Sequence, residues 1–370
     1  MSTYPWLVNY PKEVAPQINP DQYRHIMDVF DESVRKNRPS PCFSNMGGSL
    51  SFESLDQKVG DFASFLQNEL KLKKGDRIAL QMPNLLQFPV ALFGALRAGL
   101  IVVNTNPLYT AHEMEHQFKD SGARAVVILA NYAHLLEKVL DKTHIEHIVV
   151  TEVGELLPFP KNFIVSSVVK YVKRMVPPFK LPKFYSFTEA LQIGSQRPYS
   201  NFDVQIQDVA FLQYTGGTTG VSKGAVLTHR NVIANMLQIA EWMKPELREG
   251  EEVVITALPL YHIFSLTVNC LAIMRFGGHN VLITNPRDIP AFIKTLKSTP
   301  FTVMTGVNTL FNALMNHKDF LSIDFSHLKV SVAGAMALQK PVAEKWLKLT
   351  KTPVLEGYGL TEASPVVCCN

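Results

Sequence analysis

The chain has 370 residues, of which 46% are hydrophobic and 18% are charged, and its formal net charge is +4. This composition is typical of a globular protein with two or three packed units, and it excludes a largely disordered chain. The weak positive charge without dense clusters of Lys and Arg argues against nucleic acid as a partner.

The first residues, Met1–Val14, contain no apolar run of the kind found in secretory signal peptides. The apolar stretch Leu85–Val103 is broken by polar residues, and Ile263–Met274 is too short for a membrane span. Cys368 and Cys369 are adjacent, and the spacing of the four cysteines suggests neither a disulfide nor a metal site. We therefore expect a cytoplasmic protein with reduced thiols.

Strands and helices alternate in the first part of the chain. A helix is predicted after Ser51 from apolar residues at helical spacing, and Leu85–Ala98 is predicted to be another helix. Short apolar runs bounded by turns predict strands at Arg77–Met82, Leu100–Asn104, Ala123–Leu129 and His147–Thr151. This βαβ alternation predicts a parallel sheet covered by helices.

The alternation resumes after about residue 205. The predicted strands are Val209–Gln213, Glu252–Ala257, Asn280–Thr284, Val303–Thr305, Lys329–Ala333 and Pro353–Glu356. The sequence thus predicts an α/β protein with two doubly wound units, residues 1–200 and 201–370, and leaves open whether the earliest residues pack on the second unit. Ligands of such folds bind at the carboxyl ends of the strands.

Between the two units lies a segment, Phe163–Tyr185, that combines an apolar stripe with basic residues. The stripe includes Ile164, Val165, Val168, Val169, Val172 and Val176, and the basic residues are Lys170, Lys173 and Arg174. Such a helix either lies on an anionic membrane surface or covers the core between the units. We slightly favour the core, because most apolar stripes are buried.

The most informative stretch is rich in glycine and hydroxyl groups. It contains Tyr214, Thr215, Gly216, Gly217, Thr218, Thr219, Gly220, Lys223 and Gly224. Glycines allow backbone N–H groups to approach an anion closely, and the hydroxyls and the lysine add donors and positive charge. Because a predicted strand precedes the stretch and a predicted helix begins near Thr228, we expect a phosphate-binding loop in the second unit.

Two further candidates follow predicted strands. In Gly357–Glu362, Tyr358 offers an aromatic face for a purine and Glu362 offers an oxygen ligand for Mg²⁺. His262 follows another strand, where a catalytic histidine and a packed core histidine are about equally common.

The run His112–His116 matches the HExxH pattern of zinc proteases. Thr110 is the predicted N-cap of this helix, so the motif lies at a solvated helix start, and a third ligand does not stand out. We therefore interpret it as part of an ordinary helix.

Together, these residues resemble the acyl-adenylating (AMP-forming) superfamily of acyl-CoA synthetases, luciferases and peptide-synthetase adenylation domains. Within it they closely resemble the bacterial long-chain fatty acid–CoA ligase family, over essentially the whole chain. The matching segments are Tyr214–Gly224, Gly357–Glu362, Met82–Asn84, Asn104–Tyr109, Thr228–Asn231, Ala257–Phe264 and Thr305–Leu310.

The resemblance implies ATP-dependent activation of a long-chain fatty acid, first to an acyl-adenylate and then to acyl-CoA, with Mg²⁺ as cofactor and with ATP and coenzyme A as substrates. Thr215 to Lys223 would hold the β- and γ-phosphates, and Glu362 with Thr215 would bind Mg²⁺. Thr361 would contact the α-phosphate, Tyr358 and Gly334-Ala335 would frame adenine, and His262 would lie beside the reacting carboxylate. The catalytic set it implies is His262, Thr361 and Glu362.

Several points stay open. The family continues beyond the second motif with a ribose-binding Asp, a hinge and a C-terminal domain carrying a catalytic lysine, whereas this sequence ends at Asn370. We therefore expect an N-terminal domain without the C-terminal one.

The identity of the substrate is a second open point. The apolar segments Ile263–Met274 and Val303–Leu310 would line the acyl tunnel. The alternatives are a ligase for medium-chain or aryl acids, or a module that binds ATP or fatty acid without turnover. Peripheral contact with the inner membrane is a further expectation.

Overall fold

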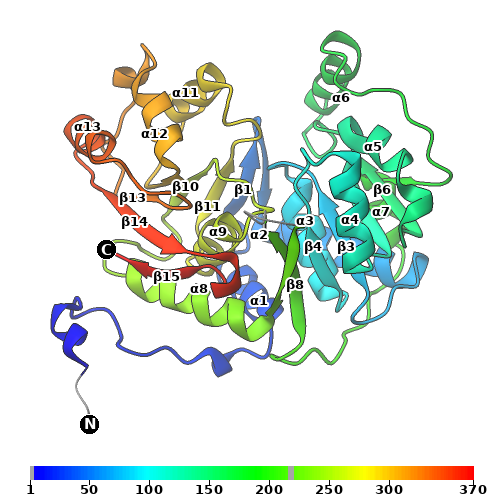
Figure 1. Ribbon diagram of the computed structural model, residues 1–370, viewed down its shortest axis with the longest axis horizontal. Coiled ribbons are helices and arrows are strands. Elements are labelled where there is room, and N and C mark those ends of the chain that lie inside the picture. The colour runs from blue at the N-terminus through cyan, green and yellow to red at the C-terminus, as the bar shows by residue number, and fades with distance from the viewer. Residues whose placement is uncertain (1–3, 216–220) are drawn as a thin grey trace.

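The computed structural model describes residues 4–215 and 221–370, which form two mainly parallel sheets covered by helices (Figure 1). The predicted α/β class with two sheets is confirmed. Among the described residues, no helix is both long and apolar enough to span a bilayer.

The first sheet has the strand order β7-β6-β5-β3-β4-β8-β9. Only its edge strand β9 runs antiparallel to its neighbour. The bounds are β3 Arg77–Gln81, β4 Ile101–Asn104, β5 Ala125–Leu129, β6 His147–Thr151, β7 Tyr185–Ser186, β8 Val209–Thr215 and β9 Lys223–Thr228. The four strands predicted in the first part of the chain are therefore confirmed to within two residues at either end.

The second sheet has the order β15-β14-β13-β12-β10-β11-β1-β2, with antiparallel strands at both edges. The bounds are β1 Pro41–Asn45, β2 Gly48–Ser51, β10 Val253–Thr256, β11 His279–Leu282, β12 Val303–Gly306, β13 Val330–Ala333, β14 Val354–Gly359 and β15 Val366–Cys369. Strand β14 continues three residues beyond the predicted end at Glu356, so part of the second motif lies within a strand.

Strand pairing does not follow the predicted division at residue 200. β1 and β2 belong to the second sheet, whereas β8 and β9, which flank the glycine-rich stretch, belong to the first. The placement of the predicted phosphate loop in the second unit was therefore wrong. The stretch also joins two antiparallel strands instead of leading directly from a strand into a helix, because residues 223–228 pair with β8.

Helices cover both sheets, and α8 lies beside the β14–β15 hairpin, with one end close to β8 and β9 (Figure 1). The main ones are α1 Ile26–Asn37, α2 Phe52–Ser64, α3 Gln87–Arg97, α4 Ala111–Ser121, α5 Ala133–Glu137, α6 Lys161–Ser167, α7 Phe187–Gly194, α8 His229–Met243, α11 Ile289–Ser298, α12 Asn308–Met315 and α13 Lys340–Thr350. Short helices α9 (Ile263–Ser265), η7 (Leu266–Ala272) and α10 (Ile273–Arg275) form one continuous helical run.

Local sequence explains where several helices begin. Thr110 caps α4, as predicted, and forms a capping box with Glu113; Thr228 caps α8 in a box with Asn231. Phe62 of α2 and Phe93 of α3 belong to one large core cluster that also includes Phe211 of β8 and Val303 of β12. The two sheets therefore share a continuous apolar core.

The segment that follows β6 is largely exposed. None of the residues of α6 or of its continuation η6 (Val168–Val172) is buried, and Phe163 and Val172 are more than two-thirds exposed. The interpretation of this stripe as a cover of the core holds only in part. Val165 and Val176 are half-buried and pack against core clusters, whereas Ile164 and Val172 are exposed on the segment that projects at the top of the molecule (Figure 1).

Candidate active site

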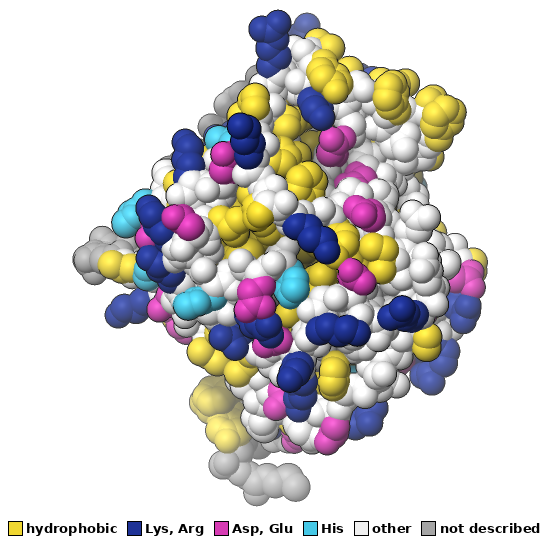
Figure 2. Space-filling view, turned by 90° about the vertical axis from the view of Figure 1, so that its right-hand side faces the viewer, with side chains coloured by type: hydrophobic (Ala, Val, Ile, Leu, Met, Phe, Trp, Pro, Cys, Tyr) yellow, Lys and Arg dark blue, Asp and Glu magenta, His cyan; other side chains and the backbone are white. Residues whose placement is uncertain are grey.

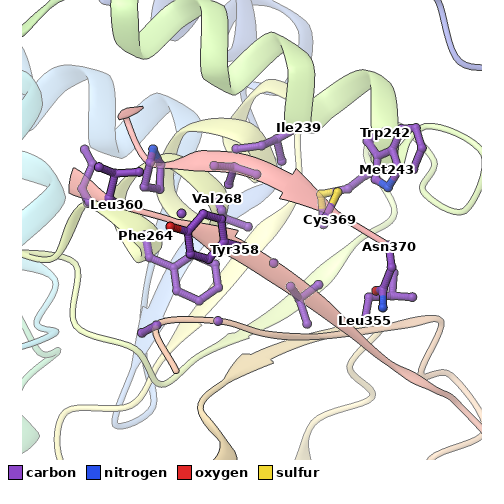
Figure 3. A pocket seen from close by; sticks show the side chains of 18 of the residues that line it. Ile239, Trp242, Met243, Phe264, Val268, Leu355, Tyr358, Leu360, Cys369 and Asn370 are labelled. Atoms are coloured by element: carbon purple, nitrogen blue, oxygen red, sulfur yellow. The ribbon is translucent and has the colours of Figure 1, made fainter. Parts of the chain in front are cut away.

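A cavity of about 250 Å³ lies beyond the carboxyl end of β13, between α8, the α9 turn and the β14–β15 hairpin. Figure 3 shows Tyr358 and Phe264 at one end and Trp242 and Met243 at the other. The cavity brings together predicted site residues that are far apart in the sequence. These are His262, Gly334, Ala335, Tyr358 and Thr361.

His262 is the N-cap of α9, and its Nδ1 accepts a hydrogen bond from the Phe264 N–H at 3.3 Å. The side chain is open to the cavity, yet surrounding protein atoms displace enough water to lower the pKa of the imidazole. His262 is therefore neutral near pH 7 and lines the cavity as an uncharged polar group.

The turn that carries His262 is held by a buried asparagine. Asn84 Nδ2 donates to the carbonyls of Thr256 and Leu258 at 3.0 and 2.9 Å, and its Oδ1 accepts from the Leu260 N–H at 2.8 Å. Three bonds to one loop fix the path of the chain between β10 and α9. The sequence had marked Asn84 only as part of a motif, without assigning a role to it.

A second buried side chain ties the same turn to the other sheet. Gln213 of β8 donates from Nε2 to the Tyr261 carbonyl at 2.6 Å and accepts from Asn104 Nδ2 at 3.1 Å. This residue was missed as a site residue. Its signal is a glutamine in a run that is otherwise apolar, since a buried amide needs specific partners.

The Gly334-Ala335 turn has little freedom. A Cβ on Gly334 would lie 2.8 Å from Phe264, which is closer than real contacts allow. Ala335 has φ of +65°, in the left-handed region that residues with a Cβ rarely adopt. Backbone strain of this kind concentrates at ligand-binding positions, so the turn is a reasonable wall for a flat ligand.

The second motif forms the β14–β15 hairpin and its connection. Tyr358 is 65% exposed, so its ring is available for stacking, and Thr361 lines the cavity. Thr361 and Glu362 lie in the short helix η9 (Thr361–Ala363), which packs against β8 and β9. The exposed Glu362 therefore lies near the ends of the hairpin that carries the glycine-rich stretch.

The β8–β9 hairpin gives two predicted phosphate ligands a structural explanation. The Tyr214 hydroxyl donates to Asp120 Oδ2 at 2.6 Å, and burial together with this carboxylate raises the pKa of Tyr214. Gly224 faces Tyr214 across the hairpin, and a Cβ there would lie 3.0 Å from its ring. These two residues stabilise the hairpin, whatever else they contact.

Thr215 and the exposed Lys223 are paired residues where the hairpin opens toward the glycines. The Ser222 hydroxyl donates to the Thr215 carbonyl at 2.6 Å and helps to close this end. Gly216, Gly217, Thr218, Thr219 and Gly220 lie outside the described residues. For Thr215 and Lys223 the phosphate role stays a prediction.

The residues of the HExxH match have other partners. Glu113 Oε2 accepts from the Thr110 N–H at 2.7 Å in the capping box. His116 Nε2 lies 2.8 Å from the Ser222 carbonyl. Helix α4 therefore supports the β8–β9 hairpin from outside.

The donor set suits magnesium bound together with phosphates. Mg²⁺ prefers oxygen ligands and is often held by one or two carboxylates while phosphate oxygens and water complete its shell. The Glu362 carboxylate and the Thr215 hydroxyl come from elements in contact, η9 and β8. Within the described residues there is no group of three or more His, Cys, Asp or Glu side chains that could hold a metal alone.

Comparison with known proteins defines the class. The model of the AMP-binding enzyme family matches residues 30–370. The chain therefore belongs to the AMP-binding enzyme family.

More particular similarities follow. The chain is 55% identical over 99% of its length to the long-chain-fatty-acid–CoA ligase of Escherichia coli O6:H1, and 33% identical to that of Bacillus subtilis. It spans about 65% of the length of these relatives. Its fold matches an anthranilate CoA ligase in complex with anthranoyl-AMP, with a TM-score of 0.82 at 19% identity over 95% of this chain and 64% of that one. It also matches a long-chain-fatty-acid-CoA ligase from Archaeoglobus fulgidus, with a TM-score of 0.78 at 24% identity over 94% of this chain and 66% of that one.

Proposed function

We propose that the protein takes part in the ATP-dependent activation of long-chain fatty acids. The carboxylate attacks the α-phosphate of ATP to form acyl-adenylate and release pyrophosphate, and the thiol of coenzyme A then displaces AMP to form acyl-CoA. The observation that carries this proposal is a cavity that joins His262, Gly334, Tyr358 and Thr361 to a mainly apolar end, where Asn370 lies near Trp242 and Met243 (Figure 3). The 55% identity to long-chain-fatty-acid–CoA ligases supports the same substrates.

The residues at the polar end suit the adenylation step by position and charge. Tyr358 would stack on adenine beside the Gly334-Ala335 turn, and Thr361 would donate to the α-phosphate. Neutral His262 would contact the fatty acid carboxylate, since a neutral donor holds the nucleophile without neutralising it. Most of the rate in phosphoryl and adenylyl transfer comes from such positioning and from stabilisation of charge.

The phosphates would lie toward the β8–β9 hairpin. Lys223 and the hydroxyl of Thr215 would hold the β- and γ-phosphates together with the glycine-rich stretch, which lies outside the described residues. Mg²⁺, held by Glu362 with Thr215, would neutralise charge on the phosphates when bound. Each of these assignments rests on the contact of η9 with β8 and β9.

The test is a pyrophosphate-release assay on this chain with ATP, Mg²⁺ and one acid at a time. We expect hexadecanoate to be activated better than octanoate or benzoate. Preference for octanoate or benzoate would support a medium-chain or aryl acid ligase instead. Binding of ATP without pyrophosphate release for any acid would favour a binding module.

We also infer that the protein is cytoplasmic and that its α6–η6 surface contacts the inner membrane. We define this surface as the exposed side chains Phe159, Phe163, Ile164, Lys170, Tyr171, Val172, Lys173, Arg174 and Met175. Hydrophobic and basic side chains lie together at the top of the molecule in Figure 2, where Figure 1 places α6. Apolar side chains can insert among lipid head groups while basic ones attract anionic lipid.

Charge reversal tests this contact. Changing Lys170, Lys173 and Arg174 to Glu should reduce co-sedimentation with anionic vesicles by at least tenfold, since each basic residue contributes about 1 kcal/mol near such a surface. The control reverses Lys340, Lys345 and Lys348 of α13, which are equally exposed on the other side of the molecule. Equal loss of binding in both variants would mean that vesicle binding depends on the net charge of the protein and not on the α6–η6 surface.

A further inference from the structure

The apolar end of the candidate site is closed by side chains that also line a second cavity. This second cavity, of about 400 Å³, lies between the outer side of α8, the end of β15 and the N-terminal segment Tyr10–Ile18. Ile239 and Trp242 of α8 and Val366 and Cys369 of β15 line both cavities. These four residues therefore form the partition between the two.

Trp242 is the largest side chain in this partition, and it is only half-buried. In Figure 3 it stands at the end of the first cavity opposite Tyr358. Its ring meets the ring of Tyr10 edge-on, with centroids 5.2 Å apart. An aromatic contact of this kind shifts an equilibrium by only about two- to tenfold, so the indole can be displaced at modest cost.

The size of the first cavity gives the partition a role. Ligand pockets for molecules of drug size usually enclose about 300–1,000 Å³, and the first cavity has about 250 Å³. If the proposed function is right, this space has to accept part of the adenylate as well as the acyl chain. A long chain needs more room than the first cavity offers, and the adjoining space is the second cavity.

We propose that Trp242 determines the acyl chain lengths that the site accepts. This inference rests on the proposed function. With the indole in place, the acyl tail ends within the first cavity. When the indole moves aside, the tail passes between α8 and β15 into the second cavity, beneath the segment Tyr10–Ile18.

The lining of the second cavity suits the end of an acyl chain held near the surface. It combines the apolar Val14, Ile18 and Ile239 with the polar Asn235, Gln238 and Glu241, of which only Gln238 is exposed. A terminal methyl group needs no polar partner, so the apolar side of this half-open channel can hold chains of different length.

The experiment measures the binding of octanoate and hexadecanoate by titration calorimetry, alongside their activation. In Trp242→Ala we expect the affinity for hexadecanoate relative to octanoate to rise by about three- to tenfold. In Gln238→Trp, which fills the second cavity and leaves the first intact, we expect hexadecanoate binding to fall at least tenfold while octanoate binding stays within about twofold. Trp6→Ala, which removes an exposed indole outside both cavities, is the matched control.

The outcomes separate the two proposals. If Trp242→Ala and Gln238→Trp both keep the wild-type ratio of hexadecanoate to octanoate affinity, Trp242 is not a chain-length determinant, even if fatty acids are activated. If the wild-type chain binds neither acid, the proposed function itself fails. If Trp242→Ala folds poorly, Gln238→Trp still tests the role of the second cavity. Gln238 is exposed on α8, so the larger side chain should not disturb the folding of the protein.

Discussion

Each sheet ends in an antiparallel hairpin, and each hairpin carries one of the two sequence motifs. The β8–β9 hairpin closes one edge of the first sheet, and the β14–β15 hairpin closes one edge of the second. In the first, Gly224 lies inside β9, whereas the other glycines of the motif fall between the two strands in the sequence. In the second, Gly357 and Gly359 lie inside β14, and the polar residues Thr361 and Glu362 lie in the connection.

The difference shows that a glycine-rich motif can serve two purposes. In β14, a Cβ on Gly359 would lie 2.3 Å from the carbonyl oxygen of Pro365, so this glycine is required for the strands to pair. A Cβ on Gly357 would meet its nearest atom at 3.7 Å, which is an ordinary contact. The fold does not require a glycine at position 357, so the absence of a side chain there is better explained by the close approach of a ligand.

The largest effect is therefore expected at Gly359. Gly359→Ala should lower the free energy of unfolding by about 3 kcal/mol or more, because the methyl group would overlap backbone that cannot move without breaking the hairpin. Gly357→Ala is the matched control, and its free energy of unfolding should stay within about 0.5 kcal/mol of wild type while ATP affinity falls. Urea unfolding of both variants measures the contrast, and equal stability would refute this division of roles.

A second prediction, with a smaller expected effect on stability, concerns the base of the first hairpin. His229 follows β9, is buried, and accepts at Nδ1 from the Ile26 N–H at 3.2 Å. Burial, helped by the nearby His25, lowers the pKa of His229 from 6.5 to about 4. Between these values the unfolded chain binds the proton more readily than the folded one, so stability is full above about pH 6.5 and falls as the pH is lowered toward 4.

From pH 7.5 to pH 5, this residue should lower the free energy of unfolding by about 2 kcal/mol. His229→Asn retains an acceptor for the Ile26 N–H but does not titrate, so the variant should lose about that much less stability over the same interval. Urea unfolding at the two pH values measures the difference between the proteins. His262 and His279, whose pKa values are also lowered, are present in both proteins and cancel, whereas the contribution of His25 changes with that of its neighbour His229.

Sequence patterns located the strands better than they located the buried side chains that hold the candidate site in place. Apolar runs such as His147–Thr151 identify buried parallel strands because both faces of such a strand are covered. β9 was missed because it is an edge strand in which only Leu227 is buried, and because it includes a lysine and a glycine. Which sheet a strand joins depends on distant partners, so the membership of β1 and β8 could not be read from neighbouring residues.

The same limit applies to the side chains that position His262. The motif around His262 was visible because it follows a strand, whereas Asn84 and Gln213 act through partners more than 40 residues away. Their hydrogen bonds exist only once both sheets share the core. A buried polar residue in an apolar run is the signal that sequence analysis can use, but it does not identify the partner.

The smallest effect concerns the connection of the second hairpin. Glu362→Gln keeps the shape of the side chain but removes its charge, so we expect an unchanged free energy of unfolding and about tenfold weaker binding of ATP in the presence of Mg²⁺, equivalent to about 1.4 kcal/mol. Without Mg²⁺, ATP affinity should not fall, because the carboxylate then offers only repulsion to the phosphates. Glu344→Gln on α13, an equally exposed glutamate away from the cavity, controls for the change in net charge. Calorimetric titration with and without Mg²⁺ measures the ATP affinity of the wild type and of both variants. If Glu362→Gln weakens ATP binding equally with and without Mg²⁺, the carboxylate positions the connection between β14 and β15 and does not hold the metal.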